Sequence, residues 1–259
     1  TFVSATSPSA SKLIVIDSSI GYIGSSNITA YCLNWRELNL RTTDSDLLSI
    51  FRRSFKDSYR SFERYTFKKI GTKRDLHTKD WFFIQDIPDI YRQRIKTKYE
   101  RLISKAEKEI LIETPYFLPG HNLRKRLCEA AQRGVNVVVI TPIHSDVHVV
   151  DIVRRHYLGA LHQAGVKLYF YTAGNLHAKG VMIDQNTFSI SSANFDYRSF
   201  RYQYELALIG KEPSLIPQLR EHFDSSLKYC NSFDYQSWKR RSTIERIIEL
   251  ILLPFRFLF

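Results

Sequence analysis

The sequence is poor in cysteine and has no long hydrophobic run. Cys32, Cys128 and Cys230 are the only cysteines among 259 residues, and they are widely spaced. This spacing argues against a disulfide framework and against a cysteine-ligated zinc site, so buried free thiols are expected. No stretch of 18 apolar residues occurs, so the sequence contains no obvious membrane span. Its 44% hydrophobic residues indicate a globular protein with one large domain or two small ones.

Negative charge is also in short supply. The chain has 38 lysines and arginines against 26 aspartates and glutamates, a net charge of +12. Such an excess favours association with an anionic partner, which could be phospholipid headgroups, a membrane surface or nucleic acid. The charge balance says nothing about which reaction, if any, the protein catalyses.

One segment combines side chains that suit phosphate chemistry. His177 and Lys179 are two residues apart, Asp184 follows Lys179 after four residues, and Asn194 lies ten residues further on. Side chains two residues apart in a β-strand point to the same face, so a strand here would present the imidazole and the ammonium side by side. A second strand over 187–191 would bring Asn194 back beside them. An imidazole with ammonium and carboxamide donors can attack or protonate a phosphate diester and bind its oxygens.

The same pattern occurs near the N-terminus. A constant offset of 167 residues relates three pairs of residues: Lys12 and Lys179, Asp17 and Asp184, and Asn27 and Asn194. An acidic residue follows in each copy, Glu37 in the first and Glu205 in the second. These correspondences indicate an internal duplication. The exception is Ala10, which stands where the second copy has His177.

The succession of patterns along the chain predicts an α/β fold with unequal lobes. Apolar strands alternate with helices across 89–228, and Gly134 and Gly165 end two of those helices, which predicts a complete second lobe. Residues 1–65 match only the part of that lobe from about residue 175 onward, so the first lobe is expected to be N-terminally truncated by over a hundred residues. The chain also begins without methionine, as a processed or truncated chain would. We interpret 66–88 as a linker.

The C-terminal tail, 229–259, is basic first and apolar afterwards. Trp238-Lys239-Arg240-Arg241 precedes an apolar stretch of thirteen residues, 247–259, which only Glu249 and Arg256 interrupt. This stretch is too short to span a bilayer but suits a helix that lies in the membrane interface. A helix that packs on the core is an equally good interpretation.

These features resemble the phospholipase D superfamily, which is defined by duplicated His-x-Lys-x4-Asp motifs, and within it the bacterial cardiolipin synthases. The segments that carry the second resemblance are Glu113-Thr-Pro-Tyr-Phe-Leu-Pro119, Ala131-Gln-Arg-Gly-Val135, Leu161-His-Gln-Ala-Gly-Val166, Ala193-Asn-Phe-Asp-Tyr-Arg-Ser-Phe200, Trp35-Arg36-Glu37 and the tail. The similarity extends over nearly the whole chain. It implies a phospholipase D-like fold, in which two pseudo-symmetric lobes, each a mixed β-sheet flanked by helices, contribute one motif each to a shared site.

The resemblance also implies a phosphatidyltransferase that acts on phosphatidylglycerol through a phosphohistidine intermediate, without a metal ion or cofactor. One histidine attacks phosphorus, and the other protonates the leaving alkoxide and then activates the incoming alcohol. The expected catalytic residues are His177, Lys179, Asp184, Lys12, Asp17, Glu37 and Glu205. The expected phosphate-binding residues are Lys12, Asn27, Lys179 and Asn194. Glu37 and Glu205 would each hold an imidazole N–H, whereas Asp17 and Asp184, on the opposite strand parity, would have a supporting structural or electrostatic role.

Ala10 is the departure that matters most for activity. The first-motif histidine is commonly the nucleophile in this family, and a methyl group has no nitrogen to attack phosphorus. Little or no turnover is therefore expected from this chain, with His177 as the acid/base histidine. A natural loss and a deliberate substitution at position 10 would look the same in the sequence.

Several alternatives stay open from the sequence. A hydrolytic phospholipase D would differ only in letting water reach the intermediate. A nuclease of the same superfamily could form if two copies each contributed His177, although the first-lobe remnant and the apolar tail argue against nucleic acid as the partner. A non-catalytic phosphate-binding protein would keep the donors without the reaction. The expected partners are phosphatidylglycerol and the membrane surface, with a homodimer or a separate N-terminal half completing the site at the cytoplasmic face of a bacterial inner membrane.

Overall fold

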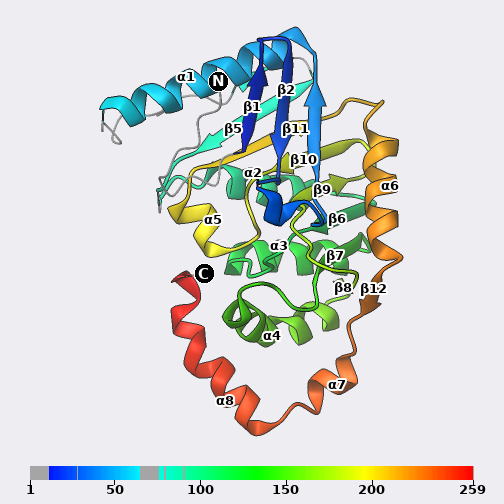
Figure 1. The fold of residues 1–259 in the computed structure, drawn as a ribbon. Coiled ribbons are helices and arrows are strands. Elements are labelled where there is room, and N and C mark those ends of the chain that lie inside the picture. The colour runs from blue at the N-terminus through cyan, green and yellow to red at the C-terminus, as the bar shows by residue number, and fades with distance from the viewer. Residues whose placement is uncertain (1–11, 28, 65–75, 79, 90, 259) are drawn as a thin grey trace.

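A mixed nine-stranded sheet forms the centre of the computed structural model, which describes residues 12–27, 29–64, 76–78, 80–89 and 91–258. The order of the strands across the sheet is β12-β8-β7-β6-β9-β10-β11-β5-β4 (Figure 1). The strands are β4 (Leu76–His77), β5 (Trp81–Asp86), β6 (Glu109–Glu113), β7 (Asn136–Pro142), β8 (Lys167–Tyr171), β9 (Gly180–Ile183), β10 (Thr187–Ser191), β11 (Glu205–Gly210) and β12 (Cys230–Ser232). Strands β6, β7 and β8 run parallel, and the other neighbouring pairs are antiparallel.

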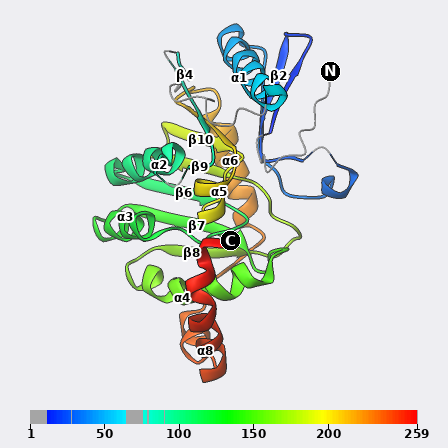
Figure 2. The same ribbon diagram turned by 90° about the vertical axis from the view of Figure 1, so that its left-hand side faces the viewer.

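The central strands are apolar on both faces because both faces are covered. Along β7, Val137 and Val139 belong to one core layer, whereas Val138 and Ile140 belong to the other. This is the alternation expected of a strand with no exposed side. The helices of the first layer are α2 (Arg94–Lys105), α3 (His121–Gln132) and α4 (His148–Gln163). Helix α6 (Ile216–Leu227) lies on the opposite side of the sheet, and the short helix α5 (Tyr197–Tyr202) follows β10 (Figure 2).

The N-terminal copy of the repeat forms a small sheet that packs on the second layer. Its strands β1 (Leu13–Ile16), β2 (Ile20–Gly24) and β3 (Asn39–Thr42) are antiparallel, and the 3-10 turn η1 (Ala30–Cys32) and helix α1 (Ser45–Arg64) complete it. Ile23, Leu40 and Phe51 are buried in the same cluster as Phe83 and Phe223 of the large lobe. The two copies therefore share one hydrophobic core.

The β-hairpin at the start of each copy has the same unusual turn. Asp17 and Ser18 have φ values of 47° and 58°, and Asp184 and Gln185 have 52° and 56°. Two successive left-handed residues form the type of turn that matches the right-handed twist of the flanking strands. In each copy four strand residues separate the motif lysine from this turn, because β1 and β9 each have four residues. The fixed spacing of the motif is thus the length of one strand.

Two details differ from the sequence-based expectations. The segment 66–88, interpreted as a linker, supplies β5, which pairs with β11 along its whole length. Phe83 and Ile84 are buried in this strand. The strand is short and ends close to Pro88, so its hydrophobic pattern in the sequence is too weak to predict a strand. The strand expected to carry His177 and Lys179 begins only at Gly180, so both residues lie in the segment that leads into β9.

The C-terminal tail folds back against α4. It contains α7 (Tyr235–Lys239), α8 (Thr243–Leu252) and the 3-10 turn η2 (Leu253–Leu258). The Trp238 indole lies against Gly159, and its N–H donates to the Arg155 carbonyl at 2.8 Å. Glu249 is buried, and Arg241 donates to both of its carboxylate oxygens at 2.8 and 3.0 Å. None of the described helices is both long enough and apolar enough to cross a membrane.

Replacing Gly159 with alanine is expected to release the tail. An added Cβ would lie 2.1 Å from the Trp238 ring, so the indole would have to move. Alanine itself favours the helix over glycine by about 1 kcal/mol, so α4 is not weakened. We expect proteolytic cleavage within residues 235–258 to become roughly tenfold faster, measured by limited proteolysis and mass spectrometry. Trp238→Ala should have the same effect, and the double variant should add nothing. An unchanged cleavage rate in Gly159→Ala would show that other contacts hold the tail.

Candidate active site

The motif of the second copy meets the loop of the first copy through backbone hydrogen bonds. Arg36 N–H donates to the Asn175 carbonyl, and His177 N–H donates to the Arg36 carbonyl, both at 2.8 Å. These bonds form a short parallel bridge between the segments around residues 36 and 176. Residues that are 140 positions apart in the chain are in this way brought into contact.

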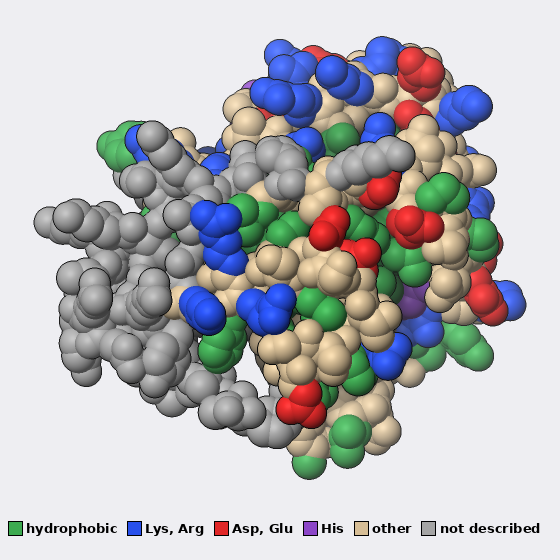
Figure 3. Space-filling model, turned by 90° about the horizontal axis from the view of Figure 1, so that it is seen from above, with side chains coloured by type: hydrophobic (Ala, Val, Ile, Leu, Met, Phe, Trp, Pro, Cys, Tyr) green, Lys and Arg blue, Asp and Glu red, His purple; other side chains and the backbone are tan. Residues whose placement is uncertain are grey.

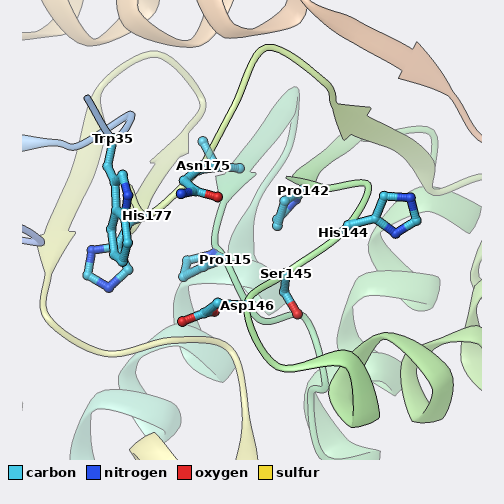
Figure 4. Close-up of a pocket in the computed structure, with 9 residues that line it drawn as sticks. Trp35, Pro115, Pro142, His144, Ser145, Asp146, Asn175 and His177 are labelled. Atoms are coloured by element: carbon cyan, nitrogen blue, oxygen red, sulfur yellow. The ribbon is translucent and has the colours of Figure 1, made fainter. Parts of the chain in front are cut away.

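Glu37 holds the imidazole of His177. Their Oε1 and Nδ1 atoms are 2.8 Å apart, and Ser25 Oγ donates to the other oxygen of the carboxylate. The Trp35 ring meets the imidazole edge to face at a centroid distance of 5.2 Å (Figure 4). With Nδ1 bound to a carboxylate, Nε2 is the nitrogen left for chemistry, which is the arrangement of a triad histidine.

Charge and burial set the protonation of this pair. Burial lowers the pKa of His177, and although Glu37 opposes this effect, the net direction is downward. Burial favours the neutral form of Glu37, but the hydrogen bonds with His177 and Ser25 and the charges of His177 and Lys179 together outweigh it, so the pKa of Glu37 is lowered. A neutral imidazole that donates from Nδ1 to an ionised carboxylate has a free lone pair on Nε2. In this state His177 can act as a base or a nucleophile.

The loop that carries Glu37 is fixed to α6 by Arg36. The guanidinium donates from Nε to Ser226 Oγ at 3.1 Å and from Nη2 to the His222 carbonyl at 2.8 Å. His222 and Ser226 in turn bind the fully buried carboxylate of Glu113, at 2.6 and 2.8 Å. This network positions Glu37. The sequence did not predict it, because Arg36 and Glu113 stand out there only as parts of the segments that resemble cardiolipin synthases.

The second copy repeats the arrangement around Ser25 and Glu37. Ser192 Oγ donates to Glu205, and it accepts from the N–H of Leu206 at 2.9 Å. Ser25 likewise accepts from Leu38 N–H at 2.9 Å. Glu205 is fully buried, and burial raises its pKa to about 7. By the symmetry of the repeat, Glu205 corresponds to the residue that would hold an imidazole of the first motif. Residue 10, where the sequence has alanine, lies outside the described residues.

The two motif lysines share this buried site. Lys179 is 4% exposed and its Nζ donates to the His177 carbonyl at 2.7 Å. Burial, followed by repulsion from Lys12, lowers the pKa of Lys179 to about 7. Burial also lowers the pKa of Lys12, although Glu205 and Glu37 oppose that shift. An anion that entered here would favour the ammonium forms of both lysines, so the site is suited to a phosphate diester.

The motif aspartates lie away from the histidine. Asp184 sits at the far end of β9, where its carboxylate accepts from the backbone N–H groups of Glu107, Lys108 and Glu109 at 2.7–3.2 Å. These bonds outweigh burial and lower the pKa of Asp184. Asp17 is exposed in the equivalent turn of β1 and β2. The structure therefore gives both aspartates a place in hairpin turns and does not bring them to the imidazole.

The two asparagines also differ in their surroundings. Asn194 is partly buried and hydrogen-bonds Asp196, whose pKa is raised by burial. Asn194 Oδ1 is buried and has no hydrogen-bond partner among the described residues. Asn27 is exposed at the end of the segment that follows β2. Only Asn194 is thus held near the motif of its own copy.

A small recess lies beside His177 where the loops after β6 and β7 end (Figure 4). Its walls are Trp35, Pro115, Pro142, His144, Ser145, Asp146, Asn175, Leu176 and His177. Among the described residues, no group of three or more His, Cys, Asp or Glu side chains could hold a metal ion. The three cysteines are free, but only Cys32 is buried, so the expectation of buried thiols is wrong for Cys128 and Cys230, which are partly exposed.

Glu205→Gln is expected to stabilise the protein in a pH-dependent way. Glu205 keeps its proton up to about pH 7 when folded, but an exposed glutamate in the unfolded chain loses it near 4.5. The unfolded state therefore gains stability as the pH rises from 4.5 to 7, which lowers the free energy of unfolding. Glutamine does not ionise, so the variant does not lose this stability. We expect the variant to be about 2–3 kcal/mol more stable at pH 8 and equal to wild type near pH 4, measured by urea unfolding. An equal gain at both pH values would contradict a titrating Glu205.

Glu37→Gln is expected to lower the pKa of His177 further. The carboxylate raises this pKa through its hydrogen bond and its charge, and an amide removes the charge, so burial and the lysines would act unopposed. NMR titration of the His177 ring measures the shift. The surface variant Glu129→Gln on α3 should leave the titration unchanged. A His177 pKa that stayed constant or rose in Glu37→Gln would show that the 2.8 Å contact does not control protonation.

Comparison with known proteins agrees with the duplicated motif. Residues 99–227 match the family model described as "Cardiolipin synthase, PLD-like domain". Cardiolipin synthase of Clostridium perfringens (strain SM101 / Type A) is 29% identical over 256 residues, 93% of this chain and 54% of the relative. The major cardiolipin synthase of Bacillus subtilis (strain 168) is 29% identical over 93% of this chain and 52% of the relative. The chain thus spans about half the length of these curated relatives.

Solved structures share the fold at much lower identity. Phosphatidylserine synthase of Haemophilus influenzae Rd KW20 superposes with a TM-score of 0.74 and 12% identity, covering 95% of this chain and 68% of that one. Polyphosphate kinase of Porphyromonas gingivalis superposes with a TM-score of 0.57 and 13% sequence identity, covering 97% of this chain and 40% of that one. These likenesses concern the fold alone. Through the duplicated motif, the family-model match and the sequence relatives taken together, the chain is similar to the phospholipase D superfamily and, within it, to the cardiolipin synthases.

Proposed function

We propose that the protein is part of a phosphatidyltransferase of the cardiolipin synthase type that acts on phosphatidylglycerol. The observation that carries the proposal is the contact between Glu37 and His177, which orients an imidazole beside the buried Lys179. An oriented imidazole next to a cation is the minimum that in-line attack on a phosphate diester requires. The printed names of the sequence relatives point to the same reaction.

In this proposal the reaction passes through a phosphohistidine. One imidazole attacks phosphorus and forms an N–P bond while the P–O bond to the leaving glycerol breaks, and the second imidazole protonates that alkoxide. The second imidazole then takes the proton of the acceptor hydroxyl, whose oxygen forms the new P–O bond as the N–P bond breaks. Lys12, Lys179 and Asn194 stabilise the non-bridging oxygens, and His177 supplies the acid/base imidazole.

Ala10 means that this chain alone has one motif histidine. A second imidazole would have to come from another copy of the chain or from a separate segment of the protein. Without it, the donors around His177 could bind a phosphate diester with no turnover, and this observation favours a phosphate-binding pseudoenzyme as the second candidate. Hydrolysis would need only water in place of the acceptor alcohol.

A nuclease is less well supported. On the face seen from above, the described Lys and Arg side chains are interspersed with Asp and Glu (Figure 3). A protein that follows a nucleic acid backbone usually presents an uninterrupted basic strip. Salt-dependent binding to DNA, with no binding to anionic vesicles, would reverse this preference.

Restoring the missing histidine tests the reaction. We expect Ala10→His to raise phosphatidyl transfer from labelled phosphatidylglycerol to glycerol by at least a hundredfold over the parent chain, because general acid–base catalysis contributes about 10²–10⁴-fold. His177→Asn in the same background should return the rate to the baseline. Transfer by Ala10→His that survived His177→Asn would refute the assignment. If Ala10→His stays inactive while vesicle binding persists, the pseudoenzyme is the better description.

The tail offers a surface for membrane association, which we include in the proposal. Helix α8 and turn η2 expose a set of large apolar side chains: Ile244, Ile247, Ile248, Leu250, Ile251, Phe255 and Leu258. Lys239 and Arg240 precede them, and Arg246 lies among them in the sequence. An apolar face with adjacent cations is the pattern of a helix that lies in the interface of an anionic membrane. One side of the tail packs on α4, and the exposed other side supports this proposal.

Placing charges on this apolar face is expected to weaken membrane binding. Ile247 and Ile251 are 50% and 61% exposed, and burying both in lipid would contribute roughly 2 kcal/mol. We expect the double variant Ile247→Glu, Ile251→Glu to bind phosphatidylglycerol vesicles at least tenfold more weakly in a sedimentation assay. Leu33→Glu with Tyr91→Glu, which are exposed apolar residues outside the tail, is the matched control. An equal loss of vesicle binding in both double variants would show that the added negative charge, and not the apolar face of the tail, explains the effect.

A further inference from the structure

A second cavity lies between the tail and the large lobe, apart from the recess beside His177. Its volume is about 260 Å³, and it is bordered by the starts of α2 and α3, by α5 and by η2. Lys96, His121, Arg201 and Arg256 line it together with Phe200 and Phe257. Apart from Asp196, the residues of this cavity have no contact with the motif residues described above.

The cavity is positively charged. Three of its lining side chains are permanent cations, Lys96, Arg201 and Arg256, whereas its one carboxylate belongs to Asp196. That carboxylate is already used, because it caps α5 by accepting from Ser199 N–H at 2.6 Å. Lys96 also faces Glu100 at 3.6 Å, which leaves two arginines without a carboxylate partner in the cavity wall. The excess charge suits an anion.

Two further features direct donors toward the same space. Helix α3 begins at Gly120 without a side-chain cap, and Gly120, His121 and Asn122 all line the cavity. The first N–H groups of an uncapped helix need acceptors and favour negative charge. Arg256 Nε is buried without a hydrogen-bond partner among the described residues. A buried guanidinium N–H of this kind is satisfied when an oxyanion binds.

The aromatic residues of the cavity connect it to the tail. Phe257 meets Tyr197 edge to face at 5.0 Å, and Arg201 lies over both rings at 5.2 and 5.1 Å. On the neighbouring positions Phe255 and Leu258 are 53% and 66% exposed. Cations are thus placed next to an exposed apolar surface, as a site for a lipid headgroup requires.

We propose that this cavity binds the phosphate of a second anionic phospholipid, the acceptor of the transfer reaction. This inference rests on the proposed function. An acceptor that is itself a phospholipid brings its own negative charge, which the phosphate bound at the lysines would repel, so it needs separate cations. Asp196 links the two sites, since it lines the cavity and its carboxylate interacts with Asn194 and Lys179.

The eight histidines allow each site to be observed separately in the full chain. Histidine-labelled protein is titrated with monomeric dihexanoyl phosphatidylglycerol at constant pH, and NMR follows the rings of His177, for the motif site, and His121, for the cavity. We expect saturable shifts of both. In Arg201→Gln, Arg256→Gln the affinity reported by His121 should fall at least tenfold, whereas the His177 response stays. The double variant Arg52→Gln, Arg53→Gln, at two exposed arginines of α1, is the matched control and should change neither.

The outcomes separate this proposal from the one on which it rests. A His177 shift without a His121 shift would overturn the cavity assignment and leave the proposed function standing. The absence of both shifts would overturn the proposed function as well. Inorganic phosphate that shifted His121 at the same concentration as the lipid would show a free-phosphate site and overturn the lipid assignment. An unchanged His121 response in the variant Arg201→Gln, Arg256→Gln would also overturn the assignment of a lipid phosphate to this cavity.

Discussion

The contact between Glu37 and His177 is the interaction on which the rest of the site depends. It crosses from one copy of the repeat to the other, so the imidazole of the second copy has a defined tautomer only when the first copy is docked. Arg36 makes this docking specific, because its backbone pairs with the segment of His177 and its guanidinium binds α6. The small sheet therefore contributes directly to the site around His177, although most residues of the fold belong to the large lobe.

Burial gives the site its chemical character. Lys12 and Lys179 are cations in a region of low dielectric, and Glu37 and Glu205 offset only part of the cost. The pKa of Lys179 and that of Glu205 both move to about 7, from opposite directions. The free protein can thus redistribute protons among these groups near neutral pH, and a bound phosphate diester would compensate the lysines more fully than the carboxylates do.

The sequence predicted much of this arrangement because repetition carries information that a single motif does not. The repeat identified Lys12 as the counterpart of Lys179 and Glu37 as the counterpart of Glu205, and the structure places Lys12 and Glu37 close to Lys179 and His177. The structural role of Asp184 was readable from strand parity. The sequence did not predict features that depend on contacts between distant residues. The network of Arg36 with His222 and Glu113 joins residues far apart in the chain. Strand β5 is recognised only by its pairing with β11.

The buried ion pair between Arg241 and Glu249 has a consequence for how the tail meets other surfaces. Apolar contacts alone would let α8 roll about its axis, because one isoleucine can replace another against α4. A buried carboxylate with a single bidentate partner allows one rotation only. The exposed apolar face therefore has a fixed direction in the free protein, and the membrane association proposed above would require no rearrangement of the helix. Its rate of association would then be set by diffusion and electrostatic attraction, and not by a folding step.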